Sequence, residues 1–161
     1  MRHREAGITL VEIVAAVTII GILSALLIPL SIKAGRYENL KLCQDNLRTL
    51  YAAQAKAPPT PTQEYGRAYW VRLTQMQPPL LSPDRLRCPF VDGADAPFCQ
   101  YFGPAGDIVK YDAKDPIGCD MELSHSDDGR QGGSVVLKNG DVVTDHTGAW
   151  GSAQHGGRCR P

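Results

Sequence analysis

The sequence predicts an α+β protein in which one long N-terminal helix, its first half transmembrane, precedes a small head with an antiparallel β-sheet. Three observations predict this fold class. Residues 8–32 are an apolar run with one ionisable side chain, residues 33–57 continue it with helical periodicity, and residues 134–145 resemble two strands joined by a tight turn. The chain therefore divides into a short basic segment at 1–7, the two halves of the helix, and a head at 58–161.

The apolar run at 8–32 is long enough to cross a bilayer. As a helix it would be about 37 Å long, and the hydrocarbon core of a bilayer is about 30 Å thick. Its ionisable residue is Glu12, and a carboxylate at the centre of a membrane helix costs about 2.5 to 3.5 kcal/mol, so Glu12 should have a partner. Pro29 has no N–H to donate, so we expect the helix to kink or loosen between Gly21 and Pro29.

The second half of the helix, residues 33–57, is predicted to be amphipathic and to pack on the head. Apolar side chains recur at spacings of three and four residues, and the mixed charges lie mostly off this stripe. Pro58 and the prolines after it should end the helix near Lys56. The stripe consists of Leu40, Cys43, Leu47 and Leu50.

Most of the segment from 58 to 98 is rich in proline and should hold little regular structure besides a short helix at 67–76. The packing face of that helix is predicted to be Tyr69, Trp70, Leu73 and Met76. Further along, residues 107–111 have the composition of a strand.

The clearest strand signal is the hairpin at 134–145. Two β-rich runs flank Asn139-Gly140, the dipeptide that best supports a type I′ turn. The glycine-rich tail from 151 to 161 should be irregular unless Cys159 ties it down.

The charge balance and the positions of the cysteines limit which functional classes and compartments are plausible. Lys and Arg together number 17, as do Asp and Glu, so no basic surface for nucleic acid is indicated. Four of the five cysteines lie in the distal half, which is typical of a small domain in an oxidising compartment. Cys88 with Cys99 and Cys119 with Cys159 are candidate disulfides, although connectivity does not follow from sequence. Cys43 lies in the apolar stripe and reads as a small buried residue.

No metal, cofactor or catalytic site is expected. The spacing of His146, His155 and Cys159 matches no usual zinc pattern, and no nucleophile motif or phosphate loop is present. No calcium loop is present either, so turn-forming roles are favoured for the aspartates that would supply one. These aspartates are Asp112, Asp115 and Asp120, or Asp127, Asp128 and Asp141. An enzyme is therefore not predicted.

The basic leader Met1–Gly7 followed by Ile8-Thr9-Leu10-Val11-Glu12 resembles the prepilin peptidase site of type IV pilins and type II secretion pseudopilins. The family pattern is Gly, a large apolar residue, Thr-Leu-(Ile/Val)-Glu, and an apolar helix with a proline about where Pro29 stands. The resemblance implies that the peptidase cuts after Gly7 and methylates the new amino group of Ile8. It further implies that Glu12 pairs with the amino terminus of a neighbouring subunit during assembly.

A second resemblance concerns the head. The tryptophan-bearing stretch 70–80 with the Arg-Cys-Pro element ending at Pro89, and the stretch 118–142, look like segments of planctomycete-type pseudopilin-like proteins. Here thirteen residues separate His125 from Asn139, where the family spacing is nine, and Asn139 replaces an aspartate. We therefore take only the hairpin from this resemblance and assign no role to His125.

Together these features predict a pilin-like or pseudopilin subunit that assembles through its helix into a type II secretion pseudopilus or a type IV pilus-like filament. The implied partners are prepilin peptidase, other pilin or pseudopilin subunits, the inner-membrane assembly platform and the membrane. The expected location is the bacterial inner membrane, single-pass, with the N-terminus cytoplasmic and the head periplasmic, or a filament beyond it. The alternative is a membrane-tethered periplasmic binding module that does not polymerise.

Overall fold

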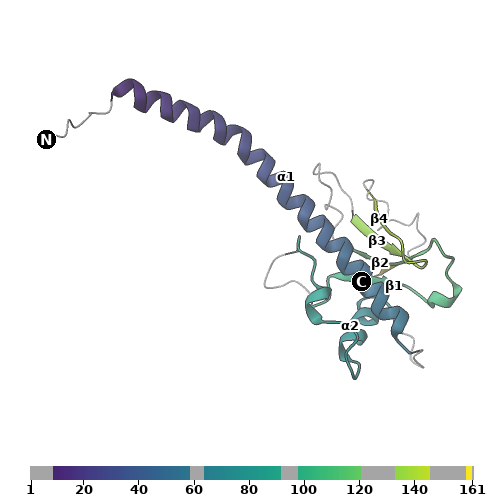
Figure 1. Ribbon diagram of the computed structural model, residues 1–161. Coiled ribbons are helices and arrows are strands. Elements are labelled where there is room, and N and C mark those ends of the chain that lie inside the picture. The colour runs from purple at the N-terminus through teal and green to yellow at the C-terminus, as the bar shows by residue number, and fades with distance from the viewer. Residues whose placement is uncertain (1–8, 59–63, 92–97, 121–132, 146–158, 161) are drawn as a thin grey trace. The chain divides into compact units, whose positions relative to one another are not determined.

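The structure is a computed structural model that divides the chain into two compact units, Met1–Gly35 and Arg36–Pro161, which are described separately. Figure 1 shows its helices and strands. The residues that it describes are 9–58, 64–91, 98–120, 133–145 and 159–160.

Helix α1 covers Leu10–Lys56 and ends just before Pro58, as the sequence predicts. The helix is continuous through Gly21 and Pro29, although Pro29 has no N–H to donate to the preceding turn. The kink expected between these two residues stays a prediction. Every side chain from residue 9 to residue 38 is exposed, so the described part of the first unit buries no core of its own.

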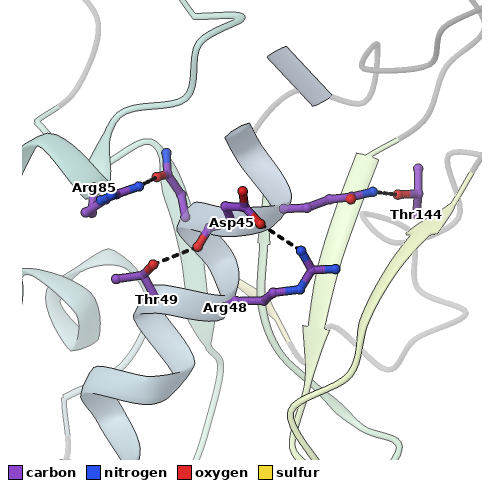
Figure 2. Close-up of polar contacts among 7 residues, drawn as sticks. Asp45, Arg48, Thr49, Arg85 and Thr144 are labelled. Carbon is purple, nitrogen blue, oxygen red and sulfur yellow. Dashed lines mark hydrogen bonds and ion pairs between the residues drawn. The ribbon is translucent and has the colours of Figure 1, made fainter. Parts of the chain in front are cut away.

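The second half of α1 buries one face in the head, which confirms the predicted apolar stripe. The structure adds two residues to the stripe, Asn46 and Ala53. On the exposed side of this half, Asp45 pairs with Arg48 at 2.7 Å, and the Asp45 carbonyl accepts a hydrogen bond from the Thr49 hydroxyl (Figure 2). The buried residues are Leu40, Cys43, Asn46, Leu47, Leu50 and Ala53.

Helix α2 covers Arg67–Gln75 and confirms the predicted short helix. Tyr69, Trp70 and Leu73 are buried, and Met76, just after the helix, packs on the same core. A 3₁₀-helix, η1, follows at Pro83–Leu86 and buries Leu86.

The described strands form an antiparallel sheet in the order β4-β3-β2-β1-β5, with β2 at its centre. Figure 1 labels β1 to β4 of this sheet. Strands β2 and β3 are buried along their whole length. The strands are β1 (Tyr101–Pro104), β2 (Pro116–Asp120), β3 (Gly133–Leu137), β4 (Val142–Asp145) and β5 (Cys159–Arg160).

The predicted hairpin is confirmed, but its turn type is wrong. Gly140 N donates to Leu137 O and Leu137 N donates to Asp141 O, both at 2.9 Å, which leaves a three-residue loop. Gly140 has φ +93°, whereas no other residue type in the described ranges has a positive φ. A type I′ turn needs positive φ at both central residues, so this is instead the three-residue loop in which a left-handed glycine ends the turn.

Tertiary hydrogen bonds account for this difference. Lys138 N donates to Asp115 O at 2.9 Å, and Asn139 N donates to Ala113 O at 3.0 Å. Two of the three loop amides are therefore bound to the preceding segment, which holds the loop in this conformation.

The prediction of a strand at 107–111 is wrong. These residues contain a 3₁₀-helix, η2, at Ile108–Lys110, and the Asp107 carboxylate accepts a hydrogen bond from Val109 N at 3.0 Å. Val109 is 80 % exposed, whereas Ile108 and Tyr111 pack on the head core from this helical turn rather than from a strand. An aspartate that caps a local turn outcompetes a strand under these conditions.

Trp70 lies at the centre of the head core. Its side chain is fully buried, and its indole N–H donates to Phe102 O at 3.0 Å. It also makes an edge-to-face contact with Tyr69, with ring centroids 4.9 Å apart. The indole lies so close to Gly118 of β2 that a Cβ there would be 2.6 Å from Trp70 Cζ2. Helix α2 can therefore pack closely on the central strand, β2, because residue 118 has no side chain.

Candidate functional site

At the N-terminal end of α1, Thr9 and Glu12 form hydrogen bonds with each other. Thr9 N and Thr9 Oγ1 each donate to Glu12 Oε2 at 2.8 Å, and Glu12 N donates to Thr9 Oγ1 at 3.3 Å. This is a capping box, in which the residue before the helix and the third residue within it exchange hydrogen bonds. Glu12 therefore has a partner within its own chain, which the sequence analysis did not identify, although the Thr-x-x-Glu spacing signals it.

Beyond this cap, the first unit presents an apolar surface in all directions. Two hydroxyls within it bond back to the helix: Thr18 Oγ1 donates to Val14 O at 2.7 Å and Ser31 Oγ to Leu27 O at 2.9 Å. Polar side chains satisfied in this way are tolerated in hydrocarbon. In length and composition α1 is a candidate membrane span, and its apolar side chains are largely exposed, from Leu10 at 79 % to Ile32 at 55 %.

In the head, Cys43 lies beside a cysteine that the sequence did not pair with it. Its Sγ is 3.6 Å from Cys88 Sγ. Cys99 Sγ donates to Tyr101 O at 3.3 Å, and the Cys119 thiol is hydrogen-bonded to Cys159. Of the candidate disulfides, the structure thus brings Cys119 and Cys159 together and places Cys88 against α1.

The surroundings of Cys43 are polar as well as buried. Its thiol donates to Asp120 Oδ1 at 2.9 Å and lies 3.3 Å from the Tyr101 hydroxyl. The Cys88 hydrogen bond, burial and the Asp120 charge all raise the pKa of the Cys43 thiol far above its usual range. Burial, with Cys43 beside it, likewise raises the pKa of Tyr101. These shifts keep Cys43 and Tyr101 protonated near neutral pH.

Asn46, one turn along α1 from Cys43, is almost fully buried and uses both ends of its amide. Its Nδ2 donates to Arg87 O at 3.0 Å and to the Tyr101 hydroxyl at 3.1 Å. Its Oδ1 accepts from Arg85 at 3.1 Å, the contact drawn at Arg85 in Figure 2. Gln44 donates from the same helix to Thr144 of β4 at 2.7 Å. A polar residue at a stripe position was the available signal for Asn46, because buried amides need partners.

Gly7 and Ile8, where the sequence places cleavage and methylation, lie outside the described residues. A match to a known family model does include these two residues. Residues 2–28 match the prokaryotic N-terminal methylation motif. The match includes the leader, the expected cleavage point, Glu12 and most of the apolar run. It supports a type IV pilin-like or pseudopilin-like protein that is a substrate of prepilin peptidase and is anchored in a membrane by its helix.

The comparisons say nothing of the head. No curated protein and no solved structure matches the chain. The resemblance of the head to planctomycete-type proteins is not confirmed.

For this pilin-like chain, the described aspartates serve the fold. Asp115 accepts a hydrogen bond from Asp112 N at 2.7 Å across a turn, and Asp141 pairs with the Asn139 amide at 2.6 Å. Asp120 accepts from Ser134 N at 2.8 Å in the buried sheet. Within the described ranges no three His, Cys, Asp or Glu side chains come together as a metal site. Five residues that the sequence offered as metal ligands, or as part of the resemblance of the head, lie outside the described ranges: His125, Asp127, Asp128, His146 and His155.

Proposed function

We propose that this pilin-like protein is a filament subunit. Prepilin peptidase would cut after Gly7 and methylate Ile8, and the helix would then assemble into a type II secretion pseudopilus or a type IV pilus-like filament. The observation that carries the proposal is the methylation motif at 2–28 on a helix whose first half is exposed and apolar on all sides.

The apolar half of α1 supplies the driving force for assembly. In the membrane its side chains contact lipid, and in a filament core they contact the helices of neighbouring subunits. Lipid tails are as apolar as these side chains, so the exchange depends on close packing between helices rather than on removal of apolar surface from water. The choice and alignment of neighbouring helices must then depend on the polar groups in the apolar half of α1. Among these groups Glu12 is the charged one.

Glu12 can serve its own helix and a neighbour together. Among the described residues, the hydrogen bonds of its carboxylate all go to Oε2. Oε1 can therefore accept from the amino group of Ile8 on an adjacent subunit without loss of the capping box. Such a pair neutralises both charges in an apolar filament core and sets the axial register of the two subunits, because an unpaired charge there is costly.

The compartment follows from the same proposal. The subunit would be single-pass in the bacterial inner membrane, with its N-terminus cytoplasmic until processing and its head periplasmic. Its partners would be the peptidase, neighbouring pilin or pseudopilin subunits and the inner-membrane assembly platform. As a structural subunit it would have no catalytic activity.

The test uses two changes at Glu12. Glu12→Gln keeps an oxygen acceptor for the capping box but removes the charge, whereas Glu12→Ala removes both. A charge-assisted hydrogen bond contributes about 1.5 to 3 kcal/mol, so each variant should enter sheared filaments about ten- to a hundredfold less than the unchanged protein. The readout is the amount of subunit in the sheared fraction relative to the membrane fraction. Glu38→Ala is the matched control, because Glu38 is an exposed carboxylate on the same helix.

Incorporation of Glu12→Gln at the unchanged level would show that Glu12 serves as a helix cap alone. Unchanged incorporation of both variants would show that Glu12 has no role in assembly, and absence of the unchanged protein from the sheared fraction would favour the membrane-tethered binding module. N-terminal mass analysis of the protein from its native membrane tests the processing step. We expect a chain that begins at N-methylated Ile8, and an intact Met1 would contradict the proposal.

A further inference from the structure

The buried face of α1 contains one cysteine, Cys43, and the structure sets its sulfur against that of Cys88. The two sulfur atoms are 3.6 Å apart, and the two residues are 0 % and 2 % exposed. They come from segments 45 residues apart in the chain, the second half of α1 and the stretch just after η1. Both lie in the unit Arg36–Pro161.

A disulfide between these residues needs a small movement. Two thiol sulfurs in contact are about 1.5 Å farther apart than bonded sulfurs, whose separation is about 2.05 Å. Each side chain can turn about its own Cα–Cβ bond to shorten the distance. The neighbours of the pair are Asp120 and the Tyr101 hydroxyl, which keep other polar partners when the Cys43 thiol proton is lost: Asp120 still accepts from Ser134 N, and the Tyr101 hydroxyl from Asn46.

We propose that Cys43 and Cys88 form a disulfide that ties the second half of α1 to the segment after η1. The inference rests on the proposed function in one respect, because a periplasmic head would meet an oxidising environment. The oxidant is a disulfide of the thiol oxidoreductase class. Cys43 and Cys88 each lose a proton and together give up two electrons, the new S–S bond forms, and the oxidant's disulfide becomes two thiols.

The bond should form while the head folds. In the folded head both sulfurs are out of reach of an oxidant, and the raised pKa of Cys43 leaves almost none of the thiolate that attacks a disulfide. Once formed, the buried disulfide would be protected from reduction, because a reductant could not reach its sulfur atoms either.

The pairing accounts for the remaining cysteines. Cys119 already meets Cys159, and Cys99 is hydrogen-bonded to a backbone carbonyl. With five cysteines, two disulfides leave one thiol, which in this arrangement is Cys99. This assignment differs from the pairing of Cys88 with Cys99 that their nearness in the sequence suggests.

Peptide mapping tests the proposal. The full-length protein is taken from its native membrane, denatured with N-ethylmaleimide and no reductant, and digested with trypsin. Cleavage after Lys41, Arg48, Arg87 and Lys110 gives peptides 42–48 and 88–110. We expect these two peptides to be cross-linked. Chymotrypsin then cuts after Phe90 and Phe98, which separates Cys88 from Cys99, and peptide 42–48 should stay attached to 88–90.

Two matched variants complete the test. Cys99→Ser should leave the cross-link unchanged, whereas Cys43→Ser should leave Cys88 alkylated by maleimide. A link between Cys88 and Cys99 in the unchanged protein, or alkylation of both Cys43 and Cys88, would overturn the proposal. The same digest reports the N-terminal peptide. Processing at Ile8 without the cross-link would refute the disulfide alone, and the cross-link in a chain that begins at Met1 would refute the proposed function alone.

Discussion

Replacement of Gly118 by alanine should destabilise the head because the new methyl group has no room. A Cβ at this position would be 2.6 Å from Trp70 Cζ2 and 3.0 Å from Val136 Cγ1. Contacts under about 3.4 Å are repulsive for carbon atoms, so one of the neighbours must move. Trp70 is the nearer one, and it is fully buried and bonded to Phe102 O.

The cost can be estimated from these contacts. An extra methyl group in a packed core costs about 1 to 3 kcal/mol, and a shift of the indole that weakens its hydrogen bond costs about 1 kcal/mol more. The loss of backbone freedom in the unfolded chain offsets about 0.4 to 1 kcal/mol. We therefore expect Gly118→Ala to lower the free energy of unfolding by about 2 kcal/mol. In contrast, Gly106→Ala should be neutral or slightly stabilising, since its Cβ would lie 3.7 Å from the nearest atom, Tyr111 Oη.

The assay is urea unfolding of the full-length protein in detergent micelles, followed by tryptophan fluorescence. Under linear extrapolation the midpoint of Gly118→Ala should fall while that of Gly106→Ala does not. The two changes add the same methyl group to the same head, so a difference between them isolates the contact with Trp70. Equal midpoints for the two variants would refute the reasoning.

Three further predictions concern the head. Gly140→Ala should lower the free energy of unfolding by about 1 to 3 kcal/mol in the same urea assay, because φ is +93° there, and unchanged stability would argue against the three-residue loop. If Cys43 and Cys88 are bonded, reduction of the denatured protein before refolding should lower its stability by about 4 kcal/mol more than the same treatment lowers that of Cys43→Ser, which can lose only the Cys119–Cys159 bond; this difference is the entropy of a loop of 45 residues. Burial raises the pKa of Cys99 above its ordinary 9.0 and that of Tyr69 above its ordinary 10.0, so the unfolded chain releases these protons first. Stability should then be flat near neutral pH and fall from about pH 9 upward, and urea midpoints that rise between pH 9 and 11 would contradict this assignment.

The elements that sequence reasoning located are those with a strong local signal. Helix α1 has an apolar run, a stripe at helical spacing and a proline just beyond its end, and α2 has apolar residues at the same spacing. The β3–β4 hairpin has β-branched residues on both sides of Asn139-Gly140. Each signal lies within a few residues of the structure that it specifies, so it can be recognised without knowledge of the fold.

Strands β1 and β2 have no such signal. Each contains a glycine and a proline, residues that weaken a strand pattern. They are strands because β2 lies between β1 and β3 and its backbone groups find partners on both sides. The segment at 107–111 shows the reverse case: its local composition suits a strand, but Asp107 caps a turn and the segment forms η2 instead.

The same division applies to the candidate site. The sequence by itself determined the methylation motif, the apolar helix and Glu12, because the peptidase and the membrane act on consecutive residues. Only the tertiary structure decided that Cys43 faces Cys88 and that Gly118 must leave room for Trp70. These contacts join segments far apart in the chain, and their partners are chosen by how helices and strands pack, which local composition does not encode.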